Sequence, residues 1–160
     1  MMPDNNSSSS VSEIVPRIPP QAPEAEQSVI GGLLVDARLW DEVVDTVRVD
    51  DFYNRAHRDI FTAIGSLQEA GEAVDIVTAS EWLKNKGTLD RAGGLAYLGE
   101  LANRTPGTTN VIAYAKIVKE RSVLRSLINA ASEITQKAFQ PQGLETNELI
   151  DFAEKLVFDI

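Results

Sequence analysis

Apolar residues recur at intervals of three and four along most of this chain, which is the spacing of one face of an α-helix. The first such segment runs from Pro23 to Val35, where Pro23 suits the first turn and Glu24 and Glu26 favour the positive end of a helix. Similar patterns, bounded by Gly, Pro or capping residues, predict helices at 36–47, 57–71, 78–86 and 93–104. The β-branched residues 74–77 are too few to found a sheet, so we expect an extended link there.

The second half of the chain predicts a long helical hairpin. Residues 109–139 contain neither Gly nor Pro, so they can form one helix of about 30 residues, roughly 45 Å long. Pro141 and Gly143 then permit a reversal before a second apolar pattern at 145–160. Two helices bury only the stripe between them, so a partner, expected to be a second copy, should cover the surplus. The residues expected at this dimer hairpin are Leu124, Leu127, Ala131, Leu149, Phe152 and Leu156.

These patterns together predict an all-α fold, a small helical head followed by a projecting long-helix hairpin. Residues 1–20 combine a Ser run and prolines with few apolar groups, which predicts a disordered tail. The head is expected at 21–108 and the hairpin at 109–160. The sequence stops inside an apolar pattern, so we expect further residues to follow in the complete protein.

Composition narrows the choice of partner and compartment. The formal net charge of −9 repels phosphate backbones, so little direct DNA binding is expected. The absence of cysteine excludes disulfides and thiolate metal sites, and no apolar run is long enough for a signal peptide or a membrane span. We therefore expect a cytoplasmic protein that makes no membrane contact. The basic residues of the long helix are interpreted as a solvated face: Lys116, Lys119, Arg121, Arg125 and Lys137.

No motif for nucleotide chemistry is complete. Gly94 and Gly99 have the glycine spacing of a phosphate loop, but Glu100 follows where the loop needs Lys. The pair Gly31 and Gly32 lies within a helical pattern, which favours close packing of helices over phosphate binding. No catalytic residue, cofactor or metal is therefore expected in this chain.

The sequence leaves two alternative functions and one group of acidic residues to consider. A small hydrolase could use His57, but a lone histidine near a helix start is more typical of a surface or capping residue. A DNA-binding regulator could use the helix-turn-helix-like segment 78–104, although Arg91 is the one basic residue near its second helix start. The acids are interpreted as a solvated surface: Asp36, Asp41, Glu42, Asp45, Asp50 and Asp51.

Five segments in order resemble one family. They read PPQAPEAEQSVIGGLL, DDFYNRAHRDIFTAI, VDIVTASEWL, GGLAYLGELANRTP and NVIAYAKIVKERSVLRSLI, within a match from about residue 19 to 160. The chain thus resembles the N-terminal domain of the bacterial replicative DNA helicase, the DnaB family. The resemblance implies a hexameric ring whose N-terminal domains dimerise through their hairpins and form a trimer-of-dimers collar. It also implies that ATP, Mg²⁺ and duplex unwinding belong to a RecA-like domain absent from this chain, so the fragment itself is no enzyme.

The resemblance further implies that the collar docks the C-terminal domain of primase during DNA replication. By motif match the contacts would involve Tyr97, Ile128 and Ile134. The alternative is that Tyr97 packs between head helices and that both isoleucines lie in the hairpin core. A helicase loader is a further candidate partner.

Overall fold

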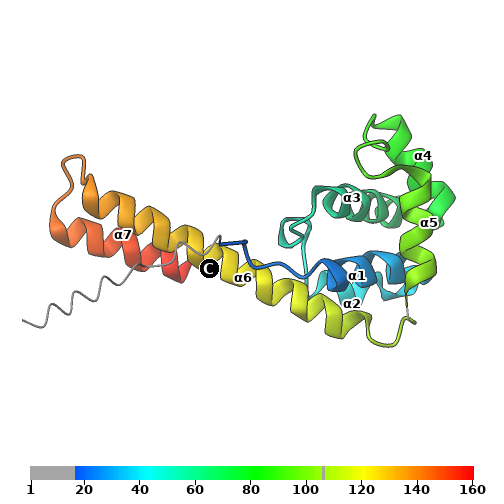
Figure 1. The fold of residues 1–160 in the computed structure, drawn as a ribbon, viewed down its shortest axis with the longest axis horizontal. Helices are drawn as coiled ribbons and strands as arrows, with labels where there is room; N and C mark the ends of the chain where they lie inside the picture. Colours follow the sequence, from blue (N-terminus) through cyan, green and yellow to red (C-terminus); the bar gives the residue numbers. More distant parts are fainter. Residues whose placement is uncertain (1–16, 106) are drawn as a thin grey trace, which may run out of the picture.

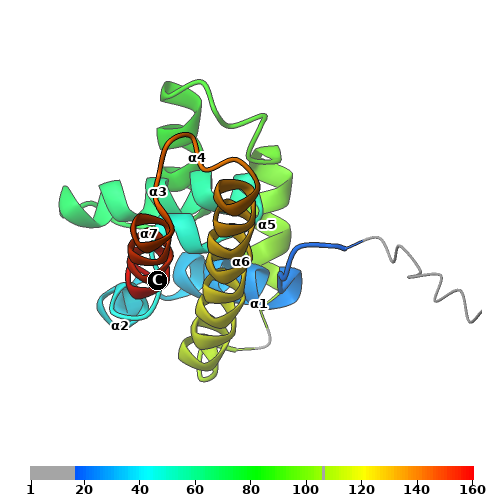
Figure 2. The ribbon, with the colours of Figure 1, turned by 90° about the vertical axis from the view of Figure 1, so that its left-hand side faces the viewer.

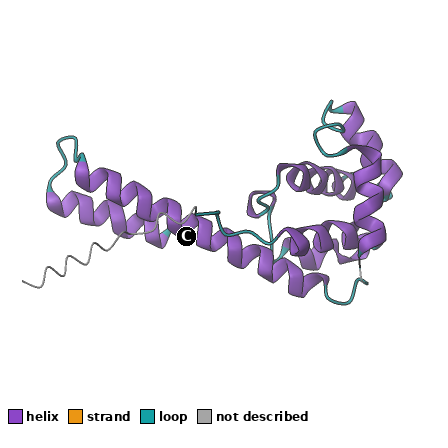
Figure 3. Cartoon of the chain, viewed as in Figure 1, coloured by secondary structure: helices purple, strands orange, loops and turns teal. Residues whose placement is uncertain are grey.

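Every regular element in the part of the chain that the computed structural model describes, residues 17–105 and 107–160, is a helix. No strand occurs in this described part, as Figure 3 shows. The predicted tail lies outside the described residues as far as residue 16. The elements in chain order are α1 Pro23–Val35, η1 Ala37–Leu39, α2 Trp40–Val44, η2 Val49–Asp51, α3 Arg55–Glu69, α4 Ile76–Asn85, α5 Gly94–Arg104, α6 Val111–Phe139 and α7 Thr146–Phe158, where η marks a 3₁₀-helix.

The expected head and projecting hairpin are confirmed. In Figure 1, α1 to α5 gather at one end of the molecule, and α6 runs from beneath them far out to the other end. There α7 reverses and runs back along α6 toward the head, and Figure 2 shows the two hairpin helices nearly end-on. None of the helices formed by the described residues has the length and apolar character needed to cross a bilayer.

Local chemistry places most helix ends where the sequence predicts them. Beyond α3 and α4, Gly71 and Gly87 have φ values of 68° and 71°, a conformation that side chains other than glycine rarely adopt. Asn54 caps α3 by accepting a hydrogen bond of 2.9 Å from the Ala56 N–H. This cap starts α3 two residues before His57, where the sequence pattern had placed the start.

The prediction of an extended link at residues 74–77 is wrong in its second half. Ile76 and Val77 are already helical and open α4. Asp75 accepts a 2.8 Å hydrogen bond from the Thr78 N–H, while Thr78 Oγ1 accepts one of 2.9 Å from the Asp75 N–H. This reciprocal cap satisfies two backbone donors, which outweighs the strand preference of two β-branched residues.

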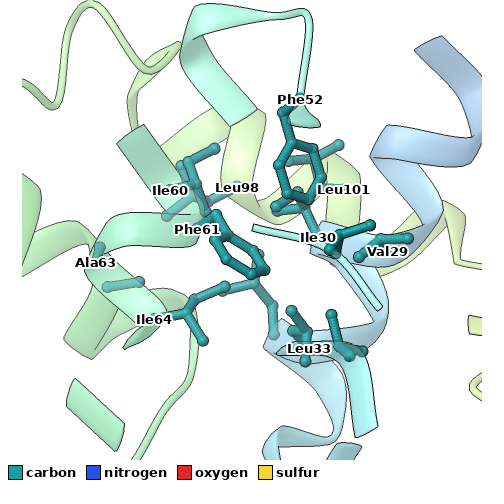
Figure 4. Packing of buried hydrophobic residues seen from close by; sticks show 14 of the residues in the cluster. Val29, Ile30, Leu33, Phe52, Ile60, Phe61, Ala63, Ile64, Leu98 and Leu101 are labelled. Atoms are coloured by element: carbon teal, nitrogen blue, oxygen red, sulfur yellow. The ribbon is translucent and has the colours of Figure 1, made fainter. Parts of the chain in front are cut away.

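The first helix is the centre of the head. Eight of the 13 residues of α1 are buried, and the helix packs against α3, α5 and α6. Figure 4 shows side chains of α1 meeting those of α3 and α5 in one apolar cluster. Its labelled members are Val29, Ile30, Leu33, Phe52, Ile60, Phe61, Ala63, Ile64, Leu98 and Leu101.

The two adjacent glycines of α1 permit these close contacts. A Cβ atom at Gly31 would collide with the Leu101 carbonyl oxygen and Thr105 Oγ1 of the α5 end. A Cβ atom at Gly32 would collide with the Val111 side chain at the start of α6. The structure thus confirms close helix packing as the role of this pair.

Head and hairpin share the long helix α6. Its first turns lie in the head core, where Val111, Ala115 and Val118 are buried. Farther along, Ala130 is buried in the hairpin. Gln142 and Gly143, with φ values of 51° and 85°, then form the reversal that leads to α7.

A methyl group added at Gly31 should destabilise the head. We expect Gly31→Ala to lower the free energy of unfolding by about 2 kcal/mol or more, because the Leu101 carbonyl belongs to the backbone and has little freedom to shift. Urea denaturation followed by circular dichroism measures this change.

Gly99→Ala is the matched control. Gly99 lies in the interior of α5, and a Cβ atom there would meet nothing within 4 Å. This substitution should raise stability by up to about 1 kcal/mol through helix propensity alone. Equal effects of the two variants would contradict the packing role.

Candidate protein-interaction site

The hairpin exposes large apolar side chains on both of its helices. Those with exposed fractions between 39% and 51% are Leu124, Leu127 and Ile128 on α6 and Ile150 and Val157 on α7. We call these five residues the hairpin surface. Scattered exposed apolar residues are common, but five on one two-helix projection indicate an interface.

The residues predicted to form the dimer hairpin divide into two groups. Leu124, Leu127 and Ala131 of α6 are exposed, whereas Leu149, Phe152 and Leu156 of α7 are half-buried. No residue of α7 is fully buried. The hairpin therefore lacks the closed core that would stabilise two helices by themselves.

A polar joint fastens α6 to the head. Asp51 is 6% exposed, and its side chain accepts a 2.7 Å hydrogen bond from Ser122 Oγ and pairs with Lys119 Nζ at 3.3 Å. The Asp51 carboxylate also accepts a hydrogen bond of 2.8 Å from the Arg48 N–H, which caps η2. The interpretation of Asp51 as a solvated acid is thus wrong, because α6 supplies donors that make its burial favourable.

Arg125 completes this joint. Its guanidinium donates hydrogen bonds of 2.6 Å to the carbonyl oxygens of Pro20 and Asp51, and it lies 5.4 Å from the centre of the Tyr53 ring. The expectation of a solvated basic face therefore fails at Arg125, whereas Lys119 pairs with Asp51 but keeps its side chain 47% exposed. These two side chains hold the hairpin at a defined orientation to the head.

A cleft of about 770 Å³ opens between the start of α1, α5 and the first half of α6. We call it the head cleft. Residues that line it include Glu24, Gln27, Tyr97, Glu100, Arg104, Tyr114, Ile117 and Arg121. Two phenol rings, an isoleucine and charges of both signs make it suited to a protein partner.

Beneath this cleft lies a chain of buried polar side chains. His57 is fully buried, and its Nδ1 lies 2.8 Å from Glu26 Oε1. Its Nε2 lies 2.7 Å from the hydroxyl oxygen of Tyr97. The expectation that His57 is a surface or capping residue is wrong, because Glu26 and Tyr97 occupy both of its ring nitrogens in the head interior.

This arrangement does not favour hydrolysis. Burial, assisted by the charges of Glu100 and Glu26, raises the pKa of Tyr97, against a smaller opposite effect of Gln27. A phenol that is harder to ionise is a poorer nucleophile. Within residues 17–105 and 107–160, no three His, Asp or Glu side chains are grouped to hold a metal ion.

The structure separates the three predicted primase contacts. Tyr97 lines the head cleft, Ile128 is 50% exposed on the hairpin, and Ile134 is half-buried. Ile128 lies about 10 Å farther along α6 than Arg121, the last cleft residue on that helix. One copy of the chain therefore does not gather all three into a single small site.

The helix-turn-helix-like segment is poorly equipped to bind DNA. Arg91, the basic residue before α5, is held by Asp59 through two hydrogen bonds of 2.8 and 2.9 Å. The first turn of α5 begins with Gly94 and Leu95, which offer no side-chain donor to a base edge. The geometry thus points to protein contacts.

Comparison with known proteins agrees with this geometry. The family model described as DnaB-like helicase N terminal domain matches residues 18–120. The chain belongs to this family. A DnaB-type N-terminal domain accounts for the all-helical head and the start of α6, both within the matched range.

Curated relatives include replicative DNA helicases. The chain is 40% identical over 143 residues to "Replicative DNA helicase DnaB" of Pasteurella multocida, covering 89% of this chain and 31% of that protein. It is 38% identical over 144 residues to "Replicative DNA helicase DnaC" of Bacillus subtilis, covering 90% and 32%. The chain thus spans about a third of the length of these relatives.

Solved structures extend the similarity to the fold. A crystal structure of the N-terminal domain of DnaB helicase from Mycobacterium tuberculosis matches with a TM-score of 0.85 and 36% identity, over 89% of this chain and all of that one. A second structure is described as a DnaB-like replicative helicase and its interactions with primase. It matches with a TM-score of 0.65 and 26% identity, over 82% of this chain and 31% of that one.

Sequence reasoning missed the buried pair Glu26 and His57, although a signal was present. Glu26 precedes Val29 and Ile30 by three and four positions, and His57 precedes Ile60 and Phe61 in the same way. Both polar residues therefore lie on core-facing sides of their helices. Asp51 and Arg125 carried no comparable signal in the apolar spacing around them.

The raised pKa of Tyr97 predicts a loss of stability at alkaline pH. Stability from this group is fully present below the ordinary tyrosine pKa of about 10 and is lost as pH rises through the higher pKa of the folded state. Urea denaturation at about pH 8 and pH 11 should show a smaller alkaline loss for Tyr97→Phe than for the unmodified chain. Tyr114→Phe, which removes another cleft phenol, should retain the full loss; identical behaviour of the two variants would contradict the prediction.

Proposed function

We propose that this chain is the collar domain of a hexameric replicative DNA helicase. It holds copies of the helicase together through the hairpin and docks the C-terminal domain of primase during replication. The hairpins pair as dimers, and three dimers close the ring of the complete protein. ATP hydrolysis with Mg²⁺ and duplex unwinding belong to another domain of that protein, so this domain acts through binding alone.

The exposed hairpin surface is the observation that carries this proposal. Helix α7 has no fully buried residue, while five large apolar side chains of the hairpin remain 39% to 51% exposed. A second hairpin, related by a two-fold axis, presents the same apolar residues and can cover this surface with no other type of residue. The polar joint at Asp51 and Arg125 supports the same function, since it fixes the direction in which each head carries its hairpin.

Primase docking draws support from the relatives and from the head cleft. One similar helicase structure is described with its interactions with primase. Because Tyr97 and Ile128 lie in different parts of one copy, a primase domain that touches both must extend from head to hairpin or bridge two copies. A helicase loader is a further candidate partner of the same collar.

A carboxylate on the hairpin surface should break the dimer. We expect Leu127→Asp to raise the dissociation constant of self-association at least tenfold, about 1.4 kcal/mol. The reason is that the dimer interface would bury the carboxylate without a partner. Light scattering and sedimentation equilibrium across concentrations measure the mass.

Asn129→Asp adds the same charge at an exposed position on roughly the opposite side of α6. This control should associate like the unmodified chain. An unmodified chain that stays monomeric at high concentration would contradict the collar proposal. Unchanged association of Leu127→Asp would place the interface elsewhere.

Primase docking makes a separate prediction. The C-terminal domain of primase should bind this chain in calorimetric titration, and Tyr97→Ala should weaken binding about tenfold or more because a ring in the head cleft is lost. Leu95→Ala truncates an exposed side chain on the same helix and should change affinity little. Equal losses in both variants would remove the head cleft from the docking site.

A further inference from the structure

Three side chains from three helices form one line of hydrogen bonds that ends at the head cleft. Glu26 of α1 meets His57 of α3 at 2.8 Å, and His57 meets Tyr97 of α5 at 2.7 Å. Glu26 and His57 are 2% and 0% exposed, whereas Tyr97 is half-buried and lines the cleft. The line thus connects the head interior to the surface that we assign to primase.

The bonds of Glu26 fix the direction of this line. Its carboxylate accepts the Tyr53 N–H at 2.9 Å and the Asn54 N–H at 3.2 Å, so it offers only acceptors to the imidazole. His57 Nδ1 therefore carries a proton, and in the neutral tautomer that this leaves, Nε2 is the acceptor for the Tyr97 hydroxyl. The phenolic proton then points into the head, and the Tyr97 oxygen acts as an acceptor toward Gln27, which lines the head cleft beside it.

The Tyr97 ring is confined as well as its hydroxyl. A Cβ atom at Gly93 would lie 2.6 Å from the Tyr97 Cβ, so the backbone before α5 packs directly on this residue. The His57 and Tyr97 rings are nearly parallel, with an interplanar angle of 10° and centroids 6.0 Å apart. Gly93 and His57 thus confine the ring, and the hydroxyl contacts His57 in the head interior and Gln27 at the cleft.

We propose that His57, oriented by Glu26, is a positioning residue that presents Tyr97 to the primase domain with its hydroxyl oxygen as a hydrogen-bond acceptor. This inference rests on the proposed primase docking and names the residues that prepare the docking site. Neither Glu26 nor His57 touches the partner, and both act through Tyr97.

Packing alone does not require this pair. A buried carboxylate and imidazole lose their hydration, and apolar side chains of similar volume often fill such a space with equal or greater stability. The polar pair supplies a defined orientation that apolar residues lack, since a phenol packed against them can rotate its hydroxyl freely. A docking surface gains affinity when its contact groups are already oriented.

The test begins with the tautomer. His57 is the sole histidine of the 160 residues, so every imidazole signal in a nitrogen NMR spectrum belongs to it. The free chain should show a protonated Nδ1 and an unprotonated Nε2. Tyr97→Phe should shift the Nε2 resonance, and Tyr114→Phe, which changes another ring of the cleft, should leave it in place.

Titration with the C-terminal domain of primase supplies the second readout. Tyr97→Phe keeps the ring but removes the hydroxyl, so affinity should fall about 3- to 10-fold. Tyr114→Phe should stay within about twofold of the unmodified chain. Glu26→Gln, if it folds, should also weaken binding, but it should add no further loss to Tyr97→Phe, because both changes break the same line of bonds.

The outcomes separate this inference from the function on which it rests. A protonated Nε2 in the free chain overturns the positioning role, and so does a Tyr97→Phe variant that is less stable yet binds primase unchanged, since the line then only joins helices. An additive loss in the double variant also overturns it. Failure of the unmodified chain to bind primase overturns the proposed docking and the positioning role together.

Discussion

The close approach of α1 to α5 and α6 is the contact on which the rest of the structure depends. It exists because positions 31 and 32 carry no side chain where the Leu101 carbonyl and Val111 come near. The head cleft lies between these same three helices, and the hairpin is the continuation of α6. The lack of a side chain at Gly31 and Gly32 therefore sets the geometry of both the head cleft and the hairpin surface.

The continuity of α6 transmits that geometry to the hairpin. A helix uninterrupted from Val111 to Phe139 leaves the head as a rigid arm, since it contains no glycine or proline at which to bend. Asp51 and Arg125 then fix the arm where it leaves the head, through bonds to the Ser122 side chain, the Asp51 carbonyl of η2 and the Pro20 carbonyl before α1. A hairpin held in this way presents its apolar residues at one angle, which a symmetric assembly requires of every copy.

The polar groups buried in the head lie close to the surfaces that it presents. Among the described residues, no buried side-chain nitrogen or oxygen lacks a hydrogen-bond partner. Asp51 lies at the joint with the hairpin, and Glu26 with His57 lies beneath the head cleft. Such groups specify one arrangement of helices, because any other would leave a charge or an imidazole buried without its partner.

Local pattern was sufficient for most of the fold. Apolar spacing, Gly71, Gly87 and the uninterrupted run of α6 predicted the helices and the hairpin, because these signals act between residues a few positions apart. The starts of α3 and α4 were exceptions: the Asn54 cap begins α3 two residues early, and the cap at Asp75 and Thr78 outweighed the strand preference of its neighbours.

The candidate sites divide in the same way. The sequence by itself determined that the hairpin carries surplus apolar residues, since a stripe is a property of one helix. Only the tertiary structure decided that His57 is buried, that Asp51 meets α6 and that Tyr97 lies apart from Ile128. The physical reason is that hydrogen-bond partners 31, 40 and 71 positions apart meet only after the chain has packed.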